Sequence, residues 1–303
     1  MIQLRGLTKR YGAVQAVTDL TFDVRPGVVT GFLGPNGSGK STTMRMILGL
    51  DRPTAGTATV GGKPYADLPA PGRVLGALLD ARAAHGGRTA RTHLRCLAAA
   101  GAVPDRRVEE VLAMAGLESA AGRRIGTFSL GMSQRLGIAA AMLGDPATLI
   151  FDEPVNGLDP DGIRWIRTLM RDLAAEGRAV LVSSHLMSEM ALTADHLVII
   201  GRGRLVADTA LSALAAEGPP GVLVRTPDAD ELVRALAGRS GTIVERDPSG
   251  GLLVTGLGAP AVGALAAASG VVLHELTPRT ISLEEAFMRL TGDSTEYRQG
   301  AAR

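Results

Sequence analysis

The stretch from residue 34 to residue 42 has the residue types of a phosphate-binding loop. It fits the pattern GxxxxGK[ST], in which glycines let successive backbone N–H groups point inward around phosphate oxygens. Lys40 is expected to reach the β and γ phosphates of a nucleotide, and the Ser41 hydroxyl to face Mg²⁺. Lys40 is one of only three lysines in the chain, which argues against the alternative of a flexible Gly/Ser loop. The predicted nucleotide-binding residues are Gly34, Pro35, Asn36, Gly37, Ser38, Gly39, Lys40, Ser41 and Thr42.

Two carboxylates and a histidine follow later apolar runs. Asp152 and Glu153 come directly after TLIF, where one carboxylate could hold Mg²⁺ and the next could polarise an attacking water. Without the upstream loop, a solvated turn would explain this pair equally well. His185 follows AVLVSS and could hydrogen-bond a γ-phosphate, although a lone histidine is more often structural.

The elements that must position these residues alternate between strands and helices. Short apolar runs predict strands that end just before the polar residues, and apolar residues at helical spacing follow. This order indicates an open parallel α/β sheet, in which ligands bind outside the carboxyl ends of the strands. The predicted strands are 2–4, 20–24, 28–33, 147–151 and 179–182, and the predicted helices are 91–100, 107–115, 132–143 and 162–175.

A second domain is expected after about residue 212. Pro219 and Pro220 mark a break, and the remainder is typical of strand, helix, two strands, helix, strand, helix. We therefore predict a large domain over 1–212 and a small α+β accessory domain over 213–303, with no nucleotide-binding loop in the second.

The ordered motifs of the first domain resemble the ATP-binding subunits of ABC transporters. Phe128-Ser129-Leu130-Gly131-Met132 is similar to the LSGGQ signature, and Asn156-Gly157-Leu158-Asp159 to the D-loop. The resemblance implies a P-loop NTPase of ABC type with a helical subdomain. It also implies that Tyr11 stacks on adenine, that Asp159 belongs to the nucleotide site, and that Ser129 and Gly131 contact the γ-phosphate held by a second copy.

This resemblance carries a mechanism. Two copies would sandwich two ATP molecules with Mg²⁺, and a separate transmembrane permease would use the energy. Lys40, Glu153 and His185 would be the catalytic residues, and Ser41, Asp152 and Asp80 would lie near the metal.

Three residues depart from the family pattern. Leu130 replaces the first signature glycine, and Met132 the signature glutamine. Asp80 stands where the coupling loop usually has glutamine. Because a bare carboxylate beside a triphosphate would be repelled, we expect Asp80 to face Mg²⁺ through a water, or Arg82 or Arg88; a solvated loop aspartate is the alternative.

Within the superfamily, FSLGMSQRLGIAAAML and SLEEAFMRLT resemble the export branch that includes bacitracin and daunorubicin resistance pumps. Lipid or sodium export stays open. A soluble ATPase acting on ribosomes or DNA is a competing class, as is a nucleotide-binding regulator without turnover, which the intact Glu153 opposes.

Composition limits the partners and the compartment. A net charge of +2 and an aromatic content of 3% do not suggest a nucleic-acid surface. A single cysteine, Cys96, suits a reducing compartment, and we expect it to be buried. The basic start MIQLRGLTKRYG has no signal-peptide core, and glycines and Pro260 interrupt the uncharged stretch 249–273, which we do not expect to span a membrane. The cytoplasmic face of the membrane is therefore the expected location.

Overall fold

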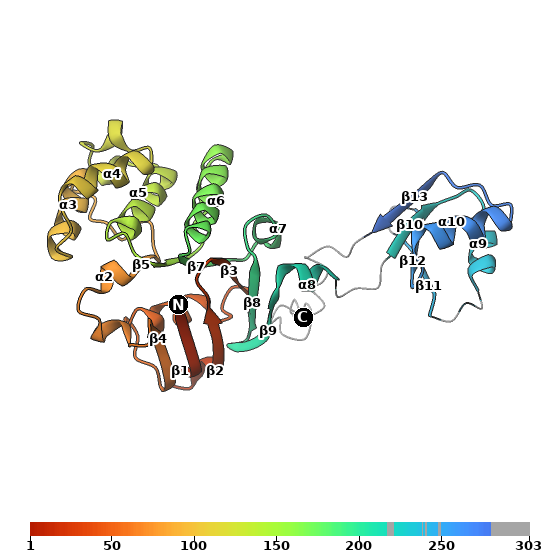
Figure 1. Ribbon diagram of the computed structural model, residues 1–303, viewed down its shortest axis with the longest axis horizontal. Helices are drawn as coiled ribbons and strands as arrows, with labels where there is room; N and C mark the ends of the chain where they lie inside the picture. Colours follow the sequence, from red (N-terminus) through yellow and green to blue (C-terminus); the bar gives the residue numbers. More distant parts are fainter. Residues whose placement is uncertain (217–220, 238, 240, 248–249, 280–303) are drawn as a thin grey trace, which may run out of the picture. The chain divides into compact units, whose positions relative to one another are not determined.

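The computed structural model describes residues 1–216, 221–237, 239, 241–247 and 250–279. These residues divide into two compact units, the first ending at Leu211 and the second beginning at Ser212 (Figure 1). Whether they are also functionally separate stays a prediction.

A six-stranded sheet forms the centre of the first unit, in the order β5-β6-β7-β3-β8-β9. All neighbouring pairs are parallel except β8 and β9, which are antiparallel. The carboxyl ends of β3, β6 and β7 therefore lie at one edge, as expected for a sheet built from alternating strands and helices. The strands are β3 (Val28–Leu33), β5 (Leu75–Leu78), β6 (Thr148–Phe151), β7 (Ala179–Ser184), β8 (His196–Gly201) and β9 (Arg204–Ala210).

A three-stranded antiparallel sheet, β2-β1-β4, packs beside it around α1 (Lys40–Ile47). Its strands are β1 (Ile2–Tyr11), β2 (Val14–Val24) and β4 (Ala55–Val60). Ile2, Leu4, Phe22, Phe32 and Met44 belong to one buried cluster, so the two sheets and α1 share a core. Burial of such side chains contributes about 1.5–3 kcal/mol each.

Three helices that contact one another form the helical subdomain: α3 (Ala90–Ala100), α4 (Arg106–Met114) and α5 (Leu130–Met142) (Figure 1). The predicted α/β fold with a helical subdomain is therefore confirmed. The expectation that Cys96 is buried is wrong, because α3 buries the face that carries Ala90, Leu94 and Ala98, and Cys96 lies outside it. The remaining helices of this unit are α2 (Pro71–Val74), α6 (Pro160–Ala175) and α7 (Met187–Ala191), while α8 (Leu211–Ala216) begins at the last residue of this unit and continues into the second.

The second unit has the order strand, helix, strand, strand, helix, strand, which is the ferredoxin-like arrangement. Its antiparallel sheet runs β11-β12-β10-β13, and α9 and α10 pack on the face that carries Val222, Val224 and Val254. The small α+β domain is thus confirmed, whereas its predicted last helix lies outside the described residues. The elements are β10 (Gly221–Arg225), α9 (Ala229–Leu236), β11 (Ile243–Arg246), β12 (Leu252–Thr255), α10 (Ala259–Ala268) and β13 (Glu275–Arg279).

Within the described ranges, no helix is both long enough and apolar enough to cross a membrane. The uncharged stretch that raised this question contains the four-residue strand β12 and the ten-residue helix α10.

Candidate functional site

The predicted phosphate-binding loop connects β3 to α1, with Lys40 as the first residue of the helix. The Lys40 side chain is nearly buried, and its Nζ donates hydrogen bonds to the carbonyl oxygens of Gly34 (2.6 Å) and Pro35 (3.3 Å). Burial lowers the pKa of Lys40, while the carboxylates of Glu153 and Asp152 act to raise it. The loop is therefore wrapped around the ammonium group. This group lies at the N-terminus of α1, a position that favours anions.

Glycine is required at two points of this loop. Gly39 has φ +104°, and a Cβ there would lie 2.7 Å from the carbonyl oxygen of Ala16. A Cβ at Gly34 would lie 2.4 Å from Ser38 Oγ and 2.5 Å from the carbonyl oxygen of Ile200. The loop thus packs too closely against its neighbours for any side chain at either position.

The Ser38 hydroxyl is buried within this loop and makes no hydrogen bond to the described part of the chain. Buried polar groups normally have a partner, so this hydroxyl fits a loop whose ligand is an oxyanion.

A cavity of about 390 Å³ opens over the loop. The loop forms one wall of the cavity and supplies the Lys40 ammonium group and backbone N–H groups. The carboxylates of Asp152 and Glu153 line the other wall. This arrangement suits a phosphorylated ligand accompanied by a metal ion. The lining residues are Ala16, Asn36, Gly37, Ser38, Gly39, Lys40, Ser41, Thr42, Leu79, Asp152 and Glu153.

Ser41 and Asp152 form the candidate metal site. Ser41 Oγ donates to Asp152 Oδ2 at 2.8 Å, and the Ser183 hydroxyl donates to the other oxygen of the same carboxylate. The described residues contain no cluster of three or more His, Cys, Asp or Glu side chains that could hold a metal by themselves. A hydroxyl and a carboxylate beside a phosphate-binding loop suit Mg²⁺, which is usually bound by one or two carboxylates together with substrate phosphates.

Glu153 is held on three sides. Its backbone has φ +49°, its N–H donates to Ser183 Oγ (2.9 Å), and its carbonyl accepts from Gln134 Nε2 (3.2 Å). Its Oε2 lies 2.8 Å from His185 Nδ1. An ionised carboxylate only accepts, so with Glu153 ionised this contact requires the His185 proton on Nδ1 and leaves Nε2 for another partner. The three predicted catalytic residues therefore lie close together. Lys40 and Glu153 line the cavity, and His185 contacts Glu153.

Tyr11 lies at the end of β1 with its side chain exposed. Its hydroxyl donates to Asp51 Oδ2 (2.8 Å), and Lys9 Nζ lies 4.8 Å from the ring centroid. Desolvation and the hydrogen-bonded Asp51 carboxylate raise the Tyr11 pKa, against the opposing influence of the Arg45 charge and the nearby Thr42 of the loop. The ring is thus fixed beside the loop, and its stacking on adenine stays a prediction.

The signature residues begin α5 and face outward. Ser129 is exposed and caps the helix, its Oγ accepting from the N–H of Met132 (3.2 Å). Gly131 packs on the D-loop, since a Cβ there would lie 2.9 Å from the Gly157 carbonyl oxygen. Leu130 lies over Gly157, where a Cβ would come within 2.3 Å of its side chain. The leucine that replaces the usual glycine therefore fills the space that Gly157 leaves.

Asp159 caps α6, and its Oδ1 accepts from the Gly162 N–H at 2.8 Å. Its side chain is outside the nucleotide pocket of its own chain, as are those of Ser129 and Tyr11. The structure gives Asp159 a helix-capping role, and its contribution to a nucleotide site stays a prediction.

Asp80 follows β5, and its Oδ1 accepts from the backbone N–H of Arg82 at 2.8 Å. In the described ranges it forms no ion pair, so the expected pairing with the Arg82 or Arg88 guanidinium is wrong. The side chain is short and its turn already satisfies one oxygen, which leaves the water-mediated contact to Mg²⁺ as a prediction.

Two residues of the site were not identified from the sequence. Ser183 lies in a recognised polar cluster after an apolar run, but nothing there indicates a contact with Asp152 and Glu153. Gln134 lies five residues after Ser129 on α5, and only the packing of that helix brings its amide to Glu153.

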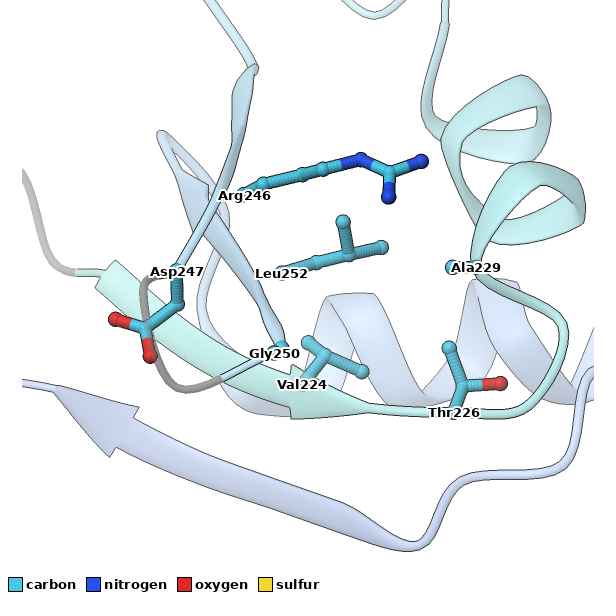
Figure 2. Close-up of a pocket in the computed structure, with 8 residues that line it drawn as sticks. Val224, Thr226, Ala229, Arg246, Asp247, Gly250 and Leu252 are labelled. Atoms are coloured by element: carbon cyan, nitrogen blue, oxygen red, sulfur yellow. The ribbon is translucent and has the colours of Figure 1, made fainter.

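The second unit has a smaller pocket of about 90 Å³ (Figure 2). Arg246 extends past Leu252 towards the segment carrying Ala229, and Asp247 points away and pairs with Arg279 (2.9 Å). This pocket is too small for a nucleotide.

Comparisons with known proteins bear on the family to which the chain belongs. The family model described as ABC transporter matches residues 17–156, and a model for a domain of unknown function matches residues 220–284. An uncharacterized ABC transporter ATP-binding protein of Bacillus subtilis, YhcH, is 33% identical over 307 residues, covering 99% of this chain and 99% of its own.

Two further matches each cover about two thirds of this chain. The bacitracin transport ATP-binding protein BcrA of Bacillus licheniformis is 41% identical over 209 residues, covering 68% of each chain. The dimeric structure of MJ0796, a bacterial ABC transporter cassette, has a TM-score of 0.64 and 25% identity, over 70% of this chain and 99% of that one. The resemblance to the bacitracin branch is thereby confirmed. This chain belongs to the ATP-binding proteins of ABC transporters, a family of ATPases.

Proposed function

We propose that this chain is the ATP-hydrolysing motor of a bacterial export pump, working at the cytoplasmic face of the membrane beside a separate permease. The observation that carries the proposal is the grouping of Lys40, Asp152 and Glu153 around one cavity, with His185 bonded to Glu153. The similarity to a bacitracin transport protein supports a drug, peptide or lipid cargo.

In this proposal each residue has a separate task. Lys40 and the loop N–H groups hold the triphosphate, and Ser41 and Asp152 would hold Mg²⁺, which would neutralise phosphate charge. Glu153 orients the attacking water and accepts its proton, and His185 holds the γ-phosphate through Nε2. Most of the rate enhancement then comes from positioning and electrostatic stabilisation, as in other phosphoryl transfers.

We also propose that two copies sandwich two ATP molecules. Ser129 is exposed and lies outside its own chain's nucleotide pocket, as a residue serving the partner's ATP must. The dimeric cassette among the similar structures supports the same assembly.

Purification of the chain from membranes in detergent tests the pump. We expect a hydrophobic permease to co-purify and to raise ATP hydrolysis. Co-purification of ribosomes or DNA in its place would support the soluble class and contradict the pump.

The same complex tests Asp80 as a coupling residue. Asp80→Ala should lower cargo-stimulated hydrolysis and transport in reconstituted membranes much more than ATP binding by the isolated chain. Unchanged transport, or an equal loss in both, would remove Asp80 from the coupling mechanism.

The second unit is proposed to stabilise or regulate the first without contributing to the ATP site, because the residues lining the nucleotide pocket all come from the first unit. A chain truncated before Pro219 should keep its affinity for ATP nearly intact in an equilibrium-binding measurement. A truncated chain that stays folded but no longer binds ATP would show that the domain division is wrong.

A further inference from the structure

The backbone of Glu153 adopts a left-handed conformation, which is rare for glutamate. Its φ of +49° lies in the left-handed region, which L-amino acids other than Asn and Asp seldom enter. Such a conformation persists only where surrounding contacts hold it, and it often occurs at functional sites. The contacts that hold this peptide therefore decide where the Glu153 carboxylate lies.

Three hydrogen bonds hold it: one within its own turn, in which the Glu153 carbonyl accepts from the Asn156 N–H at 3.2 Å, and two with side chains of other elements. Ser183 of β7 accepts from the Glu153 N–H, and Gln134 of α5 donates to the Glu153 carbonyl. Ser183 also donates to Asp152, so its position is shared with the candidate metal site. Gln134 makes the contact from the helical subdomain, and its side chain is only 4% exposed.

The direction of the Gln134 contact is set by its chemistry. A carbonyl only accepts, so the amide nitrogen of Gln134 must be the atom that faces Glu153. Because a buried amide is costly unless it is hydrogen-bonded, the contact fixes the side chain as well as the backbone it reaches. Gln134 lies in the same rigid helix as the Ser129 cap, about 7.5 Å along its axis.

Resting on the proposed function, we propose that Gln134 is a positioning residue for ATP hydrolysis. Its hydrogen bond holds the left-handed peptide that aims the Glu153 carboxylate at the attacking water and at His185. The same hydrogen bond connects the position of the Glu153 carboxylate to α5, so a shift of α5 alters the catalytic geometry. Gln134 does not touch the nucleotide and acts through Glu153.

Gln134→Met in the full chain removes the donor and keeps length and helix propensity. We expect kcat to fall at least about tenfold, since small misplacements of a catalytic group can cost up to about 100-fold, while KM changes less than about twofold. Ser133→Ala, on the same helix and also buried, is the matched control and should hydrolyse ATP at the wild-type rate.

Gln134→Glu supplies a second readout, the pH dependence of kcat, which would not change if Gln134 had a purely structural role. An ionised carboxylate cannot donate to the Glu153 carbonyl, whereas a protonated carboxyl can, and burial shifts that protonation towards neutral pH. The ratio of variant to wild-type kcat should therefore rise several-fold as the pH falls from about 8 to about 6.

Several results would overturn the inference. A Gln134→Met protein with wild-type kcat would do so, as would a Gln134→Glu ratio that is flat with pH. A loss of kcat that is accompanied by equal changes in KM and a large fall in Tm would assign Gln134 to folding alone. If Glu153→Gln itself hydrolyses ATP normally, the proposed function fails; if Glu153→Gln is inactive and Gln134→Met is normal, only this inference fails.

Discussion

Replacing Glu153 with glutamine should lower kcat for ATP hydrolysis by about 100- to 10,000-fold, the usual contribution of a general base. The amide keeps the shape of the side chain and can still hydrogen-bond to His185 Nδ1, but it cannot accept the proton of water. ATP affinity should change little, because the cation and N–H groups of the loop remain. Phosphate release and equilibrium nucleotide binding, measured on the same protein, check both parts.

Glu118→Gln is a suitable control, since Glu118 is exposed on the surface of the first unit. It should hydrolyse ATP at the wild-type rate. A Glu153→Gln protein that does the same would remove Glu153 from the reaction.

Lys40→Ala should weaken ATP binding by at least about 30-fold. Removing one partner of a buried, hydrogen-bonded charge pair typically costs about 2–5 kcal/mol, and about 1.4 kcal/mol corresponds to a factor of ten. The other two lysines, Lys9 and Lys63, lie outside the cavity lining, so neither replaces the lost charge. Equilibrium binding of ATP measures the loss directly.

Lys63→Ala provides the matched control, because Lys63 is exposed and lies outside the cavity lining. It should bind ATP normally. Lys40 also bonds to Gly34 and Pro35, so the Tm of Lys40→Ala must stay close to wild type for the comparison to hold. Wild-type affinity in a folded Lys40→Ala protein would contradict the role of the loop.

The sequence predicts best what depends on short-range pattern. The glycine spacing around Lys40 specifies a loop that packs too tightly for side chains, and the structure shows this at Gly34 and Gly39. The strands before Asp152 and His185 are apolar because they are buried, so their ends mark the functional edge of the sheet. Local composition was enough for these parts.

Contacts between distant segments could not be predicted in the same way. Gln134 meets Glu153 only because α5 packs on β5, which pairs with β6 in the sheet. Ser183 meets Asp152 only because β6 and β7 pair in parallel with Phe151 opposite Val182. Neither the helix packing nor the strand pairing can be deduced from the residues that make the contact. At Asp80 the sequence suggested a contact that the structure does not form. The neighbouring arginines suggested an ion pair, but Asp80 Oδ1 accepts a hydrogen bond from the Arg82 backbone N–H of its own turn.

Sedimentation of Glu153→Gln with Mg²⁺ and ATP tests the central claim most directly, because binding without turnover should trap the ATP sandwich. We predict that the particle mass doubles with ATP and not with ADP. A monomer at saturating ATP, with nucleotide binding verified in the same sample, would contradict the ATP-driven dimer.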